Sequence, residues 1–148
     1  MTEHVLRYTR VFDAPRELVF SCMVEPEHMT HFWGPIGVTT PLDQITVDAR
    51  PGGAFTTVMV NDADGSTYPT SARYTEVSAP ERLSWVEAHS GMTVTVRFTD
   101  LGDDRTQVDI EQAHVPAQML DPGAQAGFRT SLDRFAAHLD RLTRAERS

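Results

Sequence analysis

Two histidines three residues apart are the first side chains in this sequence whose spacing could support chemistry. His28 and His31 fall in a segment, 27–32, whose pattern predicts a short helix, and this spacing brings both imidazoles to one helical face, where they could bind a metal ion. The segment lacks the HExxH pattern of zinc hydrolases and has no obvious third ligand. His114 and His138 have no partner visible in the sequence. We therefore expect an exposed helix face and no metal site.

The other reactive groups argue against nucleophilic and nucleotide chemistry. Cys22 falls in the middle of an apolar helical pattern, where a thiol is usually an inert core residue. Gly52 and Gly53 precede a strand-like run and lack the Lys-Ser or Lys-Thr pair of a phosphate-binding loop, so a tight turn explains them. All 13 basic residues are arginines, which excludes Schiff-base chemistry on a lysine. No cofactor is expected.

Several polar residues fall on strands that should lie near the centre of a sheet. A buried polar group needs a partner, so we expect most of them on a solvated face and one or two in a pocket. Tyr74 and Trp85 are favoured as pocket residues, because each combines a large ring with one polar group that can orient a ligand. The other members of this set are Arg73 and three residues that could supply acids and bases to an enzyme, Glu87, His89 and Arg97.

Aromatic and methionine side chains indicate where an apolar pocket could lie. Phe32 and Trp33 stand between the short helix and a loop rich in Gly and Pro, so they either guard a pocket mouth or plug the end of the core. Phe55 and Met59 share one face of a predicted strand. Alternation of period two marks that face as buried without distinguishing a pocket wall from packed core. A second face of this kind carries Met92, Val94, Val96 and Phe98.

The elements that must position these residues are strands joined by short turns, with three helices. Turns this short and this rich in Gly, Asp and Ser impose antiparallel neighbours, so the class is α+β with a meander of antiparallel strands. Helices are expected at 16–24, 27–32 and 122–144. Strands are expected at 4–12, 45–48, 54–60, 66–77, 82–89, 92–99 and 105–113.

The last helix is the element long enough to cover the meander. Asp121 and Pro122 supply an N-cap and a first-turn proline. The helix then presents an apolar stripe at spacings of four and three, made of Phe128, Leu132, Phe135, Leu139 and Leu142. We assign the N-terminal end of this stripe, Phe128 and Leu132, to a pocket wall and the remainder to the packed core.

The overall composition restricts the partners and the compartment. A length of 148 residues suits a single domain over 1–148, and 13 basic against 21 acidic residues give a net charge of −8, which opposes attraction to nucleic acid or anionic lipid. The single cysteine and the lack of a leader pattern predict a cytoplasmic protein. No apolar run approaches the roughly 20 residues that span a membrane, so no membrane insertion is expected. A homodimer is the default expectation for assembly.

Five segments of the chain occur in the order found in a known family. They are FDAPRELVF at 12–20, HFWGP at 31–35, RPGGAF at 50–55, ARYTEVSAPERLSW at 72–85 and AGFRTSLDRFAAHL at 126–139. With them the sequence resembles the family named after the activator of the heat-shock protein 90 ATPase, within the START-like, polyketide-cyclase-like (SRPBCC) superfamily. The resemblance implies a helix-grip fold, in which a curved antiparallel sheet wraps around the C-terminal helix and the ordered core covers about 4–144. Ala72 and Phe128 stand where the family usually has glycine and tryptophan.

The resemblance leaves three functions open, because the superfamily includes lipid carriers, hormone receptors, aromatases, cyclases and co-chaperones. The favoured hypothesis is a carrier, sensor or sequestering protein that binds a small hydrophobic or aromatic ligand in a cavity between sheet and helix. The alternatives are a cyclase-, dehydratase- or hydrolase-like enzyme that uses the same cavity, and a co-chaperone-like interaction domain. The residues expected to bind the ligand are Phe32, Trp33, Phe55, Met59, Tyr74, Trp85, Phe128 and Leu132.

Overall fold

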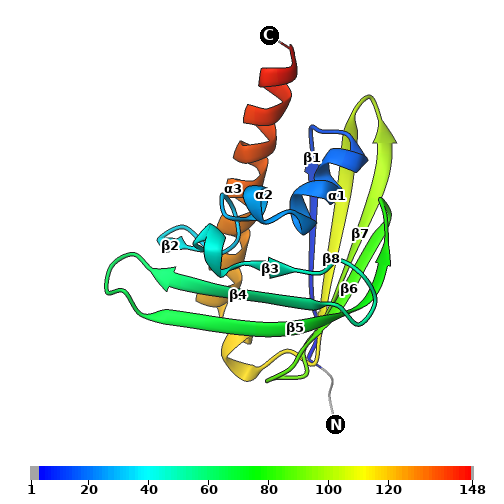
Figure 1. Cartoon of the computed structure of the whole chain (residues 1–148). Coiled ribbons are helices and arrows are strands. Elements are labelled where there is room, and N and C mark those ends of the chain that lie inside the picture. The colour runs from blue at the N-terminus through cyan, green and yellow to red at the C-terminus, as the bar shows by residue number, and fades with distance from the viewer. Residues whose placement is uncertain (1–3, 148) are drawn as a thin grey trace.

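A single antiparallel sheet runs through the computed structural model, which describes residues 4–147 (Figure 1). The strands follow the order β1-β8-β7-β6-β5-β4-β2, and β3 also pairs with β4. Their bounds are β1 Leu6–Phe12, β2 Val38–Thr39, β3 Thr46–Val47, β4 Ala54–Asn61, β5 Thr67–Ser78, β6 Arg82–Glu87, β7 Thr93–Gly102 and β8 Arg105–Ala113. Strands β4 to β8 are neighbours in chain order, so the meander predicted from the short turns is confirmed.

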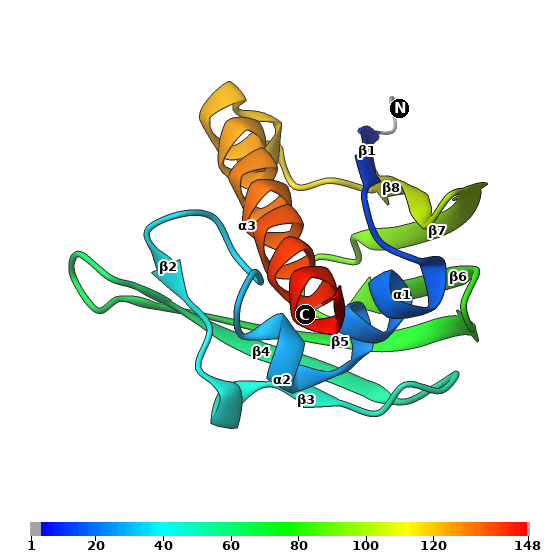
Figure 2. The same cartoon turned by 90° about the horizontal axis from the view of Figure 1, so that it is seen from above.

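One long helix lies in the concave side of this sheet, as the view from above shows (Figure 2). This helix is α3, Pro122–Arg147, and the short helices α1, Arg16–Val24, and α2, Pro26–Met29, lie beside its C-terminal half. Two 3₁₀ turns complete the chain, η1 at Leu42–Gln44 and η2 at Ala117–Leu120. The α+β class and the helix-grip arrangement expected from the sequence are therefore confirmed.

The ends of several elements differ from the expected ones by a few residues. The second helix stops at Met29, because the chain turns through residues 30–34 to bring the following aromatics inward. The short strand β2 was not expected, since two residues carry no periodicity. The start of α3 agrees with its prediction: Asp121 Oδ2 accepts hydrogen bonds from the backbone N–H groups of Gly123 at 2.9 Å and Ala124 at 3.3 Å.

The curvature of the sheet has local causes in the sequence. The pairing register shifts between Tyr74 and Glu76 in β5 and between Asp100 and Gly102 in β7, and such bulges increase strand twist and bend. Gly53 stands at the start of β4, where an added Cβ would lie 1.9 Å from the carbonyl oxygen of Asp48. Only glycine fits that position, so the Gly52-Gly53 pair serves a tight turn, as expected from the sequence.

The C-terminal half of α3 is held by an aromatic stack. The Phe135 ring lies parallel to that of Phe32, with centroids 4.0 Å apart and an interplanar angle of 9°, and also contacts Phe12 at 4.8 Å. All three rings are buried, as is Leu139 one turn further along the helix. Burial along the apolar stripe is uneven: Phe135 and Leu139 are buried, whereas Phe128 is only half-buried.

None of the helices within residues 4–147 is long and apolar enough to cross a membrane. The expectation of a single domain over 1–148 stays a prediction.

The packed half of α3 generates a stability prediction. Leu139 is 2% exposed, so Leu139→Ala should lower the free energy of unfolding by about 2–5 kcal/mol, because the side chain leaves a cavity that its neighbours cannot fill. Urea titration followed by circular dichroism measures this change. An exposed leucine, Leu42, provides the control: Leu42→Ala should change the same free energy by less than about 0.5 kcal/mol. Equal effects of the two substitutions would contradict the assignment of Leu139 to the core.

Candidate functional site

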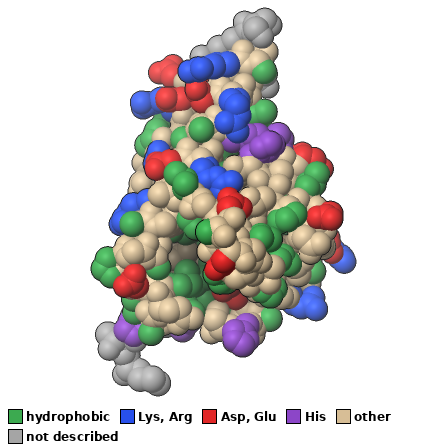
Figure 3. Space-filling view, turned by 90° about the vertical axis from the view of Figure 1, so that its left-hand side faces the viewer, with side chains coloured by type: hydrophobic (Ala, Val, Ile, Leu, Met, Phe, Trp, Pro, Cys, Tyr) green, Lys and Arg blue, Asp and Glu red, His purple; other side chains and the backbone are tan. Residues whose placement is uncertain are grey.

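A cavity of about 450 Å³ lies between the concave face of the sheet and the N-terminal half of α3. The space-filling view shows the molecular surface hollowed on one side, with hydrophobic side chains inside the hollow (Figure 3). Strands β4 to β8 line one wall, residues 32–35 form a rim, and α3 contributes Gly127, Phe128, Ser131, Leu132 and Phe135. The volume falls within the range of small-molecule sites.

An aromatic cluster forms one wall of the cavity. The rings of Trp33, Phe55 and Trp85 contact one another, with centroid separations of 5.3 Å for Trp33 and Phe55, 5.2 Å for Phe55 and Trp85, and 6.2 Å for the two tryptophans. The contacts of Phe55 are edge-to-face, which is a favoured aromatic geometry. Phe128 of α3 also lines the cavity, and its ring contacts that of Tyr8 of β1 at 4.3 Å. The cavity therefore offers aromatic surfaces to an apolar molecule.

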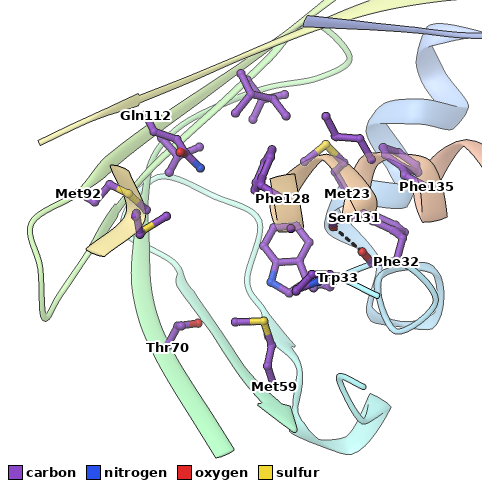
Figure 4. A pocket seen from close by; sticks show the side chains of 18 of the residues that line it. Met23, Phe32, Trp33, Met59, Thr70, Met92, Gln112, Phe128, Ser131 and Phe135 are labelled. Carbon is purple, nitrogen blue, oxygen red and sulfur yellow. Dashed lines mark hydrogen bonds between the residues drawn. The ribbon is translucent and has the colours of Figure 1, made fainter. Parts of the chain in front are cut away.

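Methionines supply much of the remaining apolar lining. Met23, Met59, Met92 and Met119 all border the cavity, and they come from α1, β4, the β6–β7 turn and η2 (Figure 4). Methionine side chains are unbranched and polarisable, so they adapt to ligands of different shape. The lining thus combines a rigid aromatic wall with adjustable side chains.

The rim of the cavity is attached to α3 by hydrogen bonds. Arg134 Nη1 donates to the carbonyl oxygens of Gly34 at 2.7 Å, Pro35 at 3.1 Å and Val38 at 3.0 Å. Ser131 Oγ donates to the carbonyl oxygen of Phe32 at 2.7 Å. The loop that follows Trp33 is therefore a fixed wall in this structure.

Comparison with known proteins agrees with this geometry. The sequence profile of the family described as Activator of Hsp90 ATPase homolog 1-like protein matches residues 13–140. The chain belongs to this family. None of the curated proteins matches it significantly. The match covers most of the chain, including all of the strands that border the cavity, β4 to β8.

Solved structures of similar proteins place this family member in the same fold. A crystal structure of a Chromobacterium violaceum protein shares 25% identity, covers 92% of this chain and 97% of its own, and superposes with a TM-score of 0.82. A crystal structure of a Nitrosomonas europaea protein shares 24% identity, covers 94% of this chain and 96% of its own, and superposes with a TM-score of 0.83. An AHSA1 protein from Silicibacter pomeroyi is similar at 24% identity and a TM-score of 0.76, with 93% and 98% of the two chains covered. The START-like fold of the family is consistent with ligand binding in a cavity.

Seven of the eight residues expected to bind a ligand line this one cavity. They are Phe32, Trp33, Phe55, Met59, Trp85, Phe128 and Leu132. Tyr74 does not line it: its ring stacks on Phe55 at 5.4 Å and meets Trp85 edge-on at 6.2 Å. Among residues 4–147 the Tyr74 hydroxyl has no hydrogen-bond partner, and burial raises the pKa of the tyrosine. Tyr74 therefore supports the aromatic wall.

Polar residues that face the cavity were only partly anticipated. Of the acid and base candidates, Glu87 lines it, whereas His89 and Arg97 are exposed and lie outside the lining. Gln112, Thr70 and Ser131 also line it and were not proposed. The inward position of Gln112 could have been predicted from the sequence, because Gln112 continues the period-two face of Val108 and Ile110 on β8.

The histidines form a cluster away from this cavity. His138 of α3 is 5% exposed, and its Nε2 lies 2.9 Å from Nδ1 of His28 on α2. His31, which is exposed as expected, stacks on the His138 ring at 4.6 Å. His28 is half-buried, so the expectation of a wholly exposed face is wrong for this residue. The cluster joins α2 to α3.

A third metal-binding side chain lies close to this pair. Ligand atoms of Cys22, His28 and His138 lie within 4.8 Å of one another, and nitrogen with sulfur suits zinc. However, Arg141 Nη2 lies 3.3 Å from Nδ1 of His138, and since a guanidinium can only donate, that nitrogen accepts. In neutral His138 the proton is then on Nε2, which donates to His28 instead of binding a metal. Burial, followed by the charge of Glu25, raises the pKa of the Cys22 thiol to about 12.

The geometry of the cluster therefore predicts that purified protein binds no stoichiometric zinc. Protein dialysed against zinc and then against buffer should retain well under one equivalent, as measured by plasma mass spectrometry. About one equivalent that is lost in His138→Ala and retained in His89→Ala, a substitution of an exposed histidine, would show that the cluster is a metal site.

The same cluster generates a pH prediction. Burial, together with His31, His28 and Arg141, lowers the pKa of His138 from 6.5 to about 4. As the pH falls below 6.5, the unfolded chain binds a proton that folded His138 does not, so stability is lost between about pH 6.5 and pH 4. At pH 5 this amounts to about 2 kcal/mol.

Urea unfolding of the wild type and of His138→Gln at pH 7.5 and pH 5 tests this prediction. The wild type should lose about 2 kcal/mol more than the variant over that interval. A His89→Gln control should lose as much as the wild type, because His89 is exposed. Parallel losses in all three proteins would contradict the assigned role of His138.

Proposed function

We propose that this protein binds a small hydrophobic or aromatic ligand in the cavity between the sheet and α3, in a carrier, sensor or sequestering role. The observation that carries this proposal is the cavity of about 450 Å³ lined by aromatic rings and four methionines. Burial of an apolar molecule there would exchange water contact for close contact with these side chains, which is the main source of affinity in such sites. The eight residues expected from the sequence contribute either lining or, for Tyr74, support.

An enzymatic role has less support from the lining. General acid and base catalysis needs positioned ionisable groups within reach of the reacting atoms. Among the described residues that border the cavity, Glu87 is the single ionisable side chain. A co-chaperone role is suggested by the family's name, which refers to an activator of the Hsp90 ATPase. A surface that binds another protein would need exposed apolar side chains. The large ones in this structure come from five separate segments of the chain and are Val11, Ile36, Leu42, Tyr68 and Leu101.

The other expectations about partners and location stay predictions. The net charge of −8 continues to argue against nucleic acid. Homodimer formation and a cytoplasmic location are likewise predictions from the sequence.

The proposed function is tested with a neutral fluorescent probe, N-phenyl-1-naphthylamine. It should bind the folded protein in one-to-one stoichiometry and be displaced by small aromatic or lipid-like compounds. Phe128→Ala should weaken binding about 10-fold, equivalent to about 1.4 kcal/mol, because the ring forms part of the cavity wall. Fluorescence titration well below the melting temperature measures both quantities.

Leu139→Ala is the matched control, because Leu139 is packed in the core of the same helix and is not part of the lining. It should destabilise the protein while the probe affinity stays within about twofold of the wild type. If the probe binds only partly denatured protein, or if both substitutions leave its affinity unchanged, the cavity is not the binding site.

A further inference from the structure

Gln112 is a polar side chain in an apolar part of the cavity wall. It stands on β8 between Leu6 of β1 and Val94 of β7 in the pairing register. It is 4% exposed, and on the same face of β8 it follows the apolar residues Val108 and Ile110. Figure 4 shows its side chain extending from the sheet into the pocket. An apolar residue would continue this face without removing an amide from water.

The Gln112 amide is not satisfied by the protein. Its Oε1 is buried and has no hydrogen-bond partner among the residues that the structure describes. Leaving such a group unpaired is unfavourable, because the amide loses its hydrogen bonds to water and gains none in return. Buried polar groups in folded proteins are nearly always paired, so this one calls for a partner that the chain does not supply.

The hydroxyl and carboxylate side chains that border the cavity do have partners. Thr70 Oγ1 lies 2.8 Å from Oγ1 of Thr57. Ser131 Oγ donates to the carbonyl oxygen of Phe32 at 2.7 Å, and Glu87 Oε2 accepts from Ser90 Oγ at 3.1 Å. Among the described lining residues with amide, hydroxyl or carboxylate groups, Gln112 is therefore the one whose side chain makes no hydrogen bond within the protein. The indole N–H groups of Trp33 and Trp85 also belong to lining residues, but they can only donate, whereas the Gln112 amide can both donate and accept.

The charges around the cavity restrict what that ligand can be. The lining contains the carboxylate of Glu87 and, among the described residues, no arginine or histidine. The whole chain carries a net charge of −8. A ligand carboxylate or phosphate would enter this site without a cation to pair with, and burying an unpaired charge is strongly unfavourable. The site therefore disfavours an anionic ligand.

We propose that Gln112 determines specificity by hydrogen bonding to an uncharged hydroxyl group on an otherwise apolar ligand. A hydroxyl can donate to the amide oxygen and accept from the amide nitrogen, so it pairs with Gln112 whichever end of the amide faces the cavity. The aromatic wall and the methionines contact the apolar body, while Gln112 sets its orientation. This inference rests on the proposed function, since it assigns a ligand class to the same cavity.

The test compares two ligands of nearly the same shape, 2-naphthol and 2-methylnaphthalene, in displacement titrations of the neutral probe. We form the ratio of their affinities in the wild type and in Gln112→Leu, so that the different water solubilities of the two compounds cancel. Gln112→Leu should lower the preference for 2-naphthol about 3- to 10-fold, as expected for one lost hydrogen bond. The anion 2-naphthoate should bind the wild type more weakly than 2-naphthol.

Gln107→Leu is the matched control, because Gln107 lies on the same strand and its side chain donates to Asp109 at 3.0 Å instead of lining the cavity. The affinity ratio should not change in this variant. An unchanged ratio in Gln112→Leu, with both compounds still bound, would overturn the role of Gln112 and leave the proposed function standing. If neither compound nor the probe binds the wild type, the proposed function itself fails.

A measurement without ligand tests the unpaired amide directly. Ligand-free Gln112→Leu should melt at a higher temperature than the wild type, because the substitution removes a buried group that lacks a partner. A lower melting temperature in both Gln112→Leu and the unbranched Gln112→Met would mean that the amide is already paired inside the protein, and the inference would be overturned. Gln112→Met also serves for the ligand comparison if the leucine variant does not fold.

Discussion

The contact between Phe135 and Phe32 marks the boundary between the packed core and the cavity. The two rings stack at 4.0 Å, and Phe12 closes on Phe135 from the first strand. They fix the C-terminal half of α3 against the short helices and one end of the sheet. Because the helix is straight and the sheet curves away from it, the N-terminal half cannot make the same close contact. The cavity is the space that results.

The features of this arrangement that follow a simple period could be predicted from the sequence. The apolar stripe of α3 repeats at helical spacing, and the structure places Phe128 at the cavity and Leu139 in the core, but it also brings Phe135, which was assigned to the core, to the edge of the cavity. The alternation in β4 likewise brought Phe55 and Met59 to one face. Period alone could not say that a void borders those faces, because the void depends on how far the sheet bends away from the helix.

Other features depend on residues that are distant in the sequence. The contact between His28 and His138 joins positions 110 residues apart, and no local pattern indicates it. Tyr74 was expected in the pocket, but the register of β5 shifts directly after it and its ring packs behind Phe55. Gln112 could have been found, since it is a polar residue at an inward position of β8. The sequence could not show that the Gln112 amide oxygen lacks a hydrogen-bond partner among the described residues, because that depends on how the surrounding side chains pack.

The attachment of Arg134 to the rim also bears on how a molecule reaches the cavity. Moving the rim away from α3 would break three hydrogen bonds of one guanidinium together, so Arg134 holds the rim against the helix. The border of the cavity at residues 119–124, where α3 begins, has no such hydrogen bonds to residues 32–35 among those described. Asp121 and Gln125 bond within their own segment, to Gly123, Ala124 and Leu120. Met119, Gly123 and Ala124 border the cavity there, so this border can move without breaking the hydrogen bonds of Arg134.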